Sequence, residues 1–171
     1  MKITDARSIK LTQGYETVVD AADFDELNQY KWYAYVRPNR PAYAVRMSRA
    51  LDGRRIEIRM HRFLLPGVEV VDHRDGDGLN NRRSNLRPAT SVENQRNRGK
   101  SRTNTSGFLG VSWHKASRRW HARIQAAPGE TLSLGYFVDL VEAARARDAA
   151  ALVYYGEFAV LNFPQPGVRS I

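Results

Sequence analysis

The stretch of residues 71–94 constrains this chain more than any other part of it. Asp72 and His73 end a valine-rich apolar run, and a polar, glycine-rich loop follows them. Asn85 lies beyond this loop, and Asn94 falls in the first turn of a predicted short helix. This order predicts a strand, a long loop, a second strand and a helix. Such a unit would bring a carboxylate, an imidazole and two amides together at one of its ends.

Those side chains favour cleavage of a phosphodiester. Asp and Asn supply oxygen ligands that suit a hard divalent cation such as magnesium. Histidine is the side chain most often used as a general base near neutral pH. The many neighbouring arginines suit a polyanionic substrate. A metal, a base and a polyanion together predict a phosphodiester-cleaving site.

The charge of the whole chain also favours nucleic acid as a partner. Over 171 residues, 27 Lys and Arg stand against 18 Asp and Glu, a net charge of +9. A merely soluble basic protein is the alternative. The absence of cysteine excludes disulfides and thiolate zinc sites. No apolar run reaches the ~18 residues of a membrane span, and the first residues lack an apolar signal core, so we expect a cytoplasmic protein.

Residues 1–60 read as a small β-rich region that supports the next segment and contacts the DNA backbone. Strands are predicted at 8–11, 15–19, 31–36 and 43–47, with a short helix at 23–30. Alternation from Ile56 to Met60 predicts a further half-buried strand. His61 precedes an apolar run and is interpreted as a structural group, with catalysis as the lesser alternative. Residues 74–83 lack the acidic twelfth ligand of a calcium loop and are predicted as a turn-rich loop.

Thr90 followed by Glu93 is a capping box, which predicts a helix from Thr90 to Gly99. Residues 100–105 then form a basic linker, the predicted domain boundary. The basic residues around this helix predict contacts with DNA phosphates. They are Arg82, Arg83, Arg87, Arg96, Arg98 and Lys100.

The pattern of residues 106–164 predicts a separate unit, followed by a tail at 165–171. Strands are expected at 108–113, 120–125 and 132–137, then an alanine-rich helix from Asp139 to Gly156. Ala143, Ala146 and Ala150 would lie against the sheet. The other sheet face stays free, and a β-sheet can enter the DNA major groove. The predicted class is α+β, with a three-stranded antiparallel sheet packed on one helix after the β-rich region.

Residues 61–97 resemble the HNH endonucleases, in the form common among phage and intron-encoded homing enzymes. Asp72, His73, Asn85 and Asn94 match in order and spacing. The resemblance implies a ββα-metal nuclease core at 61–99 that cleaves double-stranded DNA with Mg²⁺, for which Mn²⁺ would substitute. It implies that His73 takes a proton from the attacking water and that Asn85 holds the other ring nitrogen. Asp72 and Asn94 would bind one metal ion.

Residues 106–164 resemble the plant APETALA/ethylene-response-factor (ERF) DNA-binding domain, which also occurs fused to HNH nucleases. The matching segments are SGFLGVSW, LGYF, EAARARDAA and GEFAVLNFP. In that family the free sheet face lies in the major groove. Several base-reading positions differ from the plant proteins, so the target sequence does not carry over. The expected DNA contacts are Leu109, Ser112, His114, Lys115, Arg118, Arg119, Arg123, Gln125, Thr131 and Ser133.

Together these features predict a phage or mobile-element DNA endonuclease with a nuclease module in front and a DNA-reading module behind. The rival is a DNA-binding protein or transcriptional regulator with an inactive nuclease core, and a third reading is an RNA-directed enzyme. The intact set of Asp72, His73, Asn85 and Asn94 favours the endonuclease. We expect a monomer without a small-molecule cofactor, in the cytoplasm of a bacterium or phage-infected host.

Overall fold

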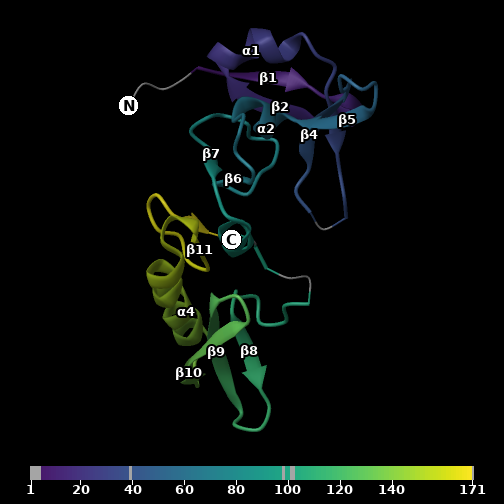
Figure 1. Ribbon diagram of the computed structural model, residues 1–171. Helices are drawn as coiled ribbons and strands as arrows, with labels where there is room; N and C mark the ends of the chain where they lie inside the picture. The colour runs from purple at the N-terminus through teal and green to yellow at the C-terminus, as the bar shows by residue number, and fades with distance from the viewer. Residues whose placement is uncertain (1–4, 39, 98, 101–102, 171) are drawn as a thin grey trace. The chain divides into compact units, whose positions relative to one another are not determined.

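The structure is a computed structural model that describes residues 5–38, 40–97, 99–100 and 103–170. It divides into two compact units, Met1–Ala89 and Thr90–Ile171, and most of their elements are labelled in Figure 1. The sequence instead predicts the boundary at residues 100–105. No helix in the described ranges is long and apolar enough to cross a membrane. The predicted mixture of several small sheets with few helices is confirmed.

The first unit begins with a hairpin of β1 (Ala6–Lys10) and β2 (Glu16–Asp20), joined through the 3-10 turn η1 (Thr12–Gly14). Helix α1 (Ala21–Asn28) follows. Strands β3 (Tyr33–Tyr35), β4 (Tyr43–Arg49) and β5 (Arg55–Arg59) form an antiparallel sheet in that order. Met60, predicted as the end of the last strand, begins α2 (Met60–Leu64) instead, because its side chain turns into the core.

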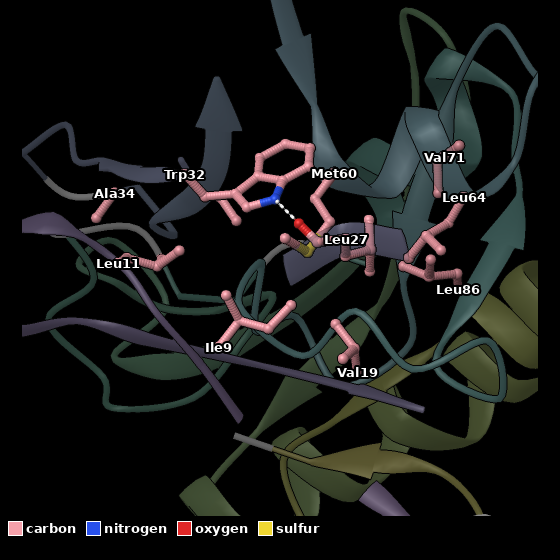
Figure 2. Close-up of a cluster of buried hydrophobic side chains, with 11 residues drawn as sticks. Ile9, Leu11, Val19, Leu27, Trp32, Ala34, Met60, Leu64, Val71 and Leu86 are labelled. Carbon is pink, nitrogen blue, oxygen red and sulfur yellow. Dashed lines mark hydrogen bonds between the residues drawn. The ribbon is translucent and has the colours of Figure 1, made fainter. Parts of the chain in front are cut away.

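One hydrophobic core holds these elements together (Figure 2). The indole Nε1 of Trp32 donates a hydrogen bond of 2.8 Å to the carbonyl of Leu27, which satisfies a buried donor. Val71 and Leu86 belong to the same core. Since they flank the predicted site residues, the core fixes the site. The buried members are Ile9, Leu11, Val19, Leu27, Trp32, Ala34, Ala44, Met60, Leu64, Val71 and Leu86.

The first unit ends in the short antiparallel pair β6 (Val71–His73) and β7 (Leu86–Pro88). The loop between them is bonded to β2. The amide of Val18 donates to the carbonyl of Leu79 at 2.9 Å, and the amide of Asn81 donates to the carbonyl of Val18 at 2.7 Å. The loop is therefore held at both its strand ends and its middle.

The second unit starts with α3 (Ser91–Arg96), and its predicted capping box is confirmed. Thr90 Oγ1 accepts from the Glu93 amide at 3.2 Å, and the Glu93 carboxylate accepts from the Thr90 amide at 2.7 Å. The helix ends at Arg96, before the predicted Gly99. Arg96 Nη2 donates to the carbonyl of Ala126 at 3.0 Å, and the guanidinium lies 4.9 Å from the Tyr155 ring.

The main sheet of the second unit has the order β10-β9-β8 and is antiparallel. Its strands are β8 (Val111–His114), β9 (Arg119–Ala127) and β10 (Glu130–Phe137). Helix α4 (Leu140–Tyr155) packs on one face, with Asp139 as its N-cap and Gly156 at its C-cap, as predicted. The 3-10 turn η2 (Gly156–Phe158) and the parallel pair β11 (Val160–Leu161) and β12 (Arg169–Ser170) complete the unit.

The buried side of α4 includes more than the predicted alanines. Ala143 is buried and the half-buried Ala150 packs against the core, as predicted, while Ala146 is half-buried. The buried stripe also holds the ion pair of Arg147 and Asp148. Asp148 accepts hydrogen bonds from the amide and side chain of Asn162 at 2.8 and 2.9 Å. The helix therefore orders the chain after η2 through buried polar groups, which a search for small apolar residues does not reveal.

Candidate active site

The predicted metal ligand Asp72 and the predicted general base His73 both lie on β6 of the β6–β7 hairpin. Asp72 lies opposite Arg87 in the antiparallel register, and His73 lies opposite Leu86. The exposed fractions of Asp72 and His73 are 3% and 4%. Because residues of a hairpin have defined cross-strand partners, Arg87 and Leu86 determine the immediate surroundings of the pair.

Asp72 forms a buried ion pair with Arg87. Arg87 Nε donates to Asp72 Oδ2 at 2.8 Å, and Nη2 lies 2.7 Å from the same oxygen. Two charges are removed from water only at high cost unless they are paired and hydrogen-bonded. The prediction that Arg87 contacts DNA phosphates therefore does not fit the structure, since its guanidinium is buried against this carboxylate.

His73 is held by a chain of buried hydrogen bonds that reaches β2. Its Nε2 lies 3.4 Å from Asn81 Oδ1, and Asn81 Nδ2 donates to Thr17 Oγ1 at 2.8 Å. Thr17 in turn donates to the carbonyl of Leu79 at 2.6 Å. Since the Asn81 amide group donates to Thr17, its carbonyl oxygen faces His73 and Nε2 carries the ring proton.

This environment also sets the charge of the ring. Burial lowers the pKa of His73, against the hydrogen bond with Asn81 and the nearby carboxylates of Asp75, Asp72 and Asp77. A neutral ring with a proton on Nε2 has its lone pair on Nδ1, which is the form that a general base requires.

The resemblance to HNH endonucleases implied that Asn85 holds the ring of His73, but in the structure Asn85 binds elsewhere. Its side-chain oxygen accepts from the Asp75 amide at 3.1 Å, and its Nδ2 donates to Asp75 Oδ1 at 2.9 Å and to the Asn80 carbonyl at 2.7 Å. Asn85 closes the loop, and Asn81 makes the predicted contact instead. Asn80, Asn81 and Asn85 are one residue type within a short stretch, and only the fold shows which of them meets His73.

Two further aromatic rings from earlier in the chain reach His73. Its ring centroid lies 5.8 Å from that of Tyr43 and 5.1 Å from that of His61, and the Tyr43 and His61 centroids are 5.4 Å apart. A Cβ on Gly78 would lie 2.3 Å from the Ala42 carbonyl oxygen and 2.6 Å from Tyr43 ring atoms. Glycine is thus required for the loop to approach this cluster.

Asn94, the predicted second metal ligand, lies half-buried on α3 in the second unit. Its pairing with Asp72 therefore stays a prediction. In the described ranges, no group of three or more His, Cys, Asp or Glu could hold a metal ion. A site of one carboxylate and one amide is of a different kind, since Mg²⁺ usually keeps several waters and binds substrate phosphate as well.

Most of the predicted phosphate-binding arginines have protein partners. Arg83 binds the Asp23 carboxylate at 2.8 Å and donates to the Leu64 carbonyl at 3.2 Å. Arg82 donates to Asn80 Oδ1 at 2.9 Å. Arg96, described above, binds within its own unit. Lys100 is exposed and contacts the Gly107 carbonyl, while Arg98 lies outside the described residues.

The second unit presents a polar sheet face opposite α4. Ala122 and Ile124 point toward the helix and are buried, while Arg123 and Gln125, which alternate with them along β9, are exposed. Cross-strand pairing extends this outer face over all three strands. It carries Ser112, His114, Arg119, His121, Arg123, Gln125, Thr131, Ser133 and Tyr136, and the exposed Lys115 and Arg118 lie in the turn beside it. Leu109 lies before β8 and binds Asn162 through its backbone.

Comparison with known proteins places the candidate site within one family match. Residues 55–96 match the HNH endonuclease family. A stretch of 62 residues is 39% identical to Protein 3.8 of Escherichia phage T7 and covers 36% of this chain and 51% of that protein. The chain thus spans about half the length of the curated relative that it matches. The resemblance of residues 106–164 to the ERF domain stays a prediction. By this match, residues 55–96 form an HNH endonuclease domain.

Proposed function

We propose that the chain is a magnesium-dependent DNA endonuclease of phage or mobile-element type. The observation that carries the proposal is the pair of Asp72 and His73, with the imidazole held in one tautomer by Asn81, inside a segment that matches HNH endonucleases. The net charge of +9 suits a polyanionic substrate.

In the proposed mechanism, His73 accepts a proton at Nδ1 from the water that attacks phosphorus. Asn81 keeps the opposite nitrogen protonated and prevents the ring from turning. Asn85 fixes the loop through Asp75, so that His73 and Asn81 keep their separation. Arg87 holds the Asp72 carboxylate in one orientation.

The donor chemistry of Asp72 and Asn94 fits a hard cation, because both offer oxygen and no sulfur or imidazole nitrogen. These two residues would hold Mg²⁺. The ion would supply charge neutralisation at the scissile phosphate and stabilise the departing 3′ oxygen.

The outer sheet face of the second unit would provide DNA recognition. It is polar and exposed, and Arg123 and Gln125 stand at its centre on β9. Arg and Gln make bidentate contacts with guanine and adenine in the major groove. The three-stranded sheet backed by one helix supports the resemblance to the ERF domain.

The test is incubation of the full chain, in parallel, with phage genomic DNA and with RNA in the presence of Mg²⁺, followed by mapping of the ends on each strand. Discrete ends that His73→Ala fails to produce support the endonuclease. DNA binding without any cut by the intact protein favours the transcriptional regulator, and cleavage confined to RNA favours the RNA-directed enzyme.

A further inference from the structure

His61 carries a nitrogen atom that the fold leaves without a partner. The side chain is 4% exposed, and its Nδ1 is buried with no hydrogen-bond partner among the described residues. The ring makes edge-to-face aromatic contacts with Tyr43 and with His73. This separates His61 from the other buried polar side chains of the site, which have polar partners.

An unpaired buried nitrogen is unfavourable for folding, because the atom loses its water and gains nothing in return. Nearly all buried polar groups in proteins are paired, so an exception in a functional site points to a ligand. A phenylalanine would make the same ring contacts at this position without burying a polar atom. The imidazole is therefore not explained by packing alone.

The place of the ring indicates which ligand this is. The His61 and His73 centroids are 5.1 Å apart and their planes are nearly perpendicular, at 87°. A substrate atom within hydrogen-bond reach of His73, roughly 3 Å, is thus close to His61 as well. Both residues lie in the segment that matches HNH endonucleases.

The charge of His61 limits what it can do there. Burial, helped by His73, Arg59 and Arg62, lowers the pKa of His61 to about 3. The ring is therefore neutral at neutral pH and has one N–H group to donate. A neutral donor suits an anionic phosphate oxygen, since hydrogen bonds to charged acceptors are shorter and stronger than those between neutral groups.

We propose that His61 is a further catalytic residue of the HNH site, donating a hydrogen bond from Nδ1 to a non-bridging oxygen of the scissile phosphodiester. The inference rests on the proposed endonuclease function. The bond strengthens as negative charge builds up on that oxygen during attack, so it acts mainly on the rate of the chemical step.

His61→Phe keeps an aromatic ring against Tyr43 and His73 but removes the nitrogen. We expect cleavage at saturating DNA to slow by about 10²–10³, the usual loss for one such donor, with DNA affinity nearly unchanged. The melting temperature should stay the same or rise, because an unpaired polar atom has been removed. If His61 had only a packing role, its replacement by phenylalanine would not slow cleavage while leaving the melting temperature unchanged or higher.

His61→Asn is the matched variant, because its Nδ2 can replace the Nδ1 donor. We expect it to cleave at least tenfold faster than His61→Phe despite filling less of the core. Wild-type cleavage by His61→Phe, or a folded His61→Asn that is no faster than His61→Phe, would overturn the inference. If His61→Phe does not fold, the inference stands or falls on whether His61→Asn retains at least a tenth of the wild-type rate.

The wild type and His73→Ala are assayed in parallel on the same duplex. If the wild type does not cut, the proposed function fails and this inference fails with it. A different result separates the two proposals: the wild type cuts, the His73→Ala variant does not cut, and the His61→Phe variant cuts at the wild-type rate. That result would reject only the role of His61.

Discussion

His61 and His73 in the first unit and His114 and His121 in the second are the four histidines of the chain, and their surroundings are opposite. The first pair is buried, with ring centroids 5.1 Å apart. The second pair is half-buried on the outer face of the sheet, 6.4 Å apart.

The two pairs of histidines also differ in their hydrogen-bond partners. His114 Nδ1 lies 2.8 Å from Ser117 Oγ, and His121 Nε2 lies 3.0 Å from Ser133 Oγ. In the first unit, His73 is oriented by a buried amide, and His61 Nδ1 has no hydrogen-bond partner in the part of the chain that the structure describes. A surface histidine with a hydroxyl partner suits recognition, whereas a buried one with an unpaired nitrogen suits reaction.

The largest effect should come from removing the metal ion. Chelation with EDTA should abolish cleavage, because the proposed site of Asp72 and Asn94 would lose the cation that neutralises charge at the scissile phosphate. Binding through the outer sheet face should continue, since it needs no metal. Added Mn²⁺ should restore cutting, given the oxygen ligands. Cleavage rates and DNA binding are measured side by side, and full cleavage in EDTA would rule out the metal assignment.

His73→Ala should slow cleavage by about 10²–10⁴, the range for loss of a general base. The matched change His121→Ala should leave the rate at saturating DNA unchanged and alter only DNA affinity. Single-turnover cleavage with both variants measures the difference. If the two variants are equally slow, or equally fast, the contrast between the two histidine pairs does not hold.

Arg87→Ala should lower the free energy of unfolding of the first unit by about 3–5 kcal/mol, because Asp72 would stay buried without its cation. Exposed Arg119→Ala, the control in the second unit, should change stability by less than about 0.5 kcal/mol. Chemical denaturation measures both. Equal stability of the two variants would mean that the buried ion pair contributes nothing.

Arg123→Ala should weaken binding to the preferred site by about 1–3 kcal/mol and relax the preference for one base pair. Lys115→Ala, in the neighbouring turn, should weaken binding to every sequence alike and reduce the salt dependence. Binding titrations on specific and random duplexes at several salt concentrations separate the two. If Arg123→Ala leaves the sequence preference unchanged, another part of the chain must read the DNA sequence.

Local signals in the sequence predicted much of the fold. Thr90 with Glu93 marks the start of α3, and Asp139 and Gly156 mark the two ends of α4. Each cap could be predicted because it depends on residues only a few positions from that helix end. Contacts between distant residues were not predictable. Thr17 meets Asn81 across 64 positions, and Arg83 meets Asp23 across 60.

Contacts between distant residues also decide what could be predicted at the candidate active site. The order of residues correctly predicted that Asp72 and His73 end a strand, but it could not predict which residue contacts the ring of His73. A count of basic residues likewise could not show that Arg83 and Arg87 bind carboxylates.

Helix α3 belongs by sequence to the HNH match, which runs to residue 96, and by contacts to the second unit. Arg96 ties it to Ala126 and Tyr155, and Arg169 donates to the backbone and side chain of Asn97 at its end. A protein truncated near residue 105 would keep this helix but lose all three of those partners from the rest of the unit. Replacement of residues 106–171 by a different domain would thus have to supply a new anchor for α3, so the last part of the HNH match depends structurally on the residues that follow it.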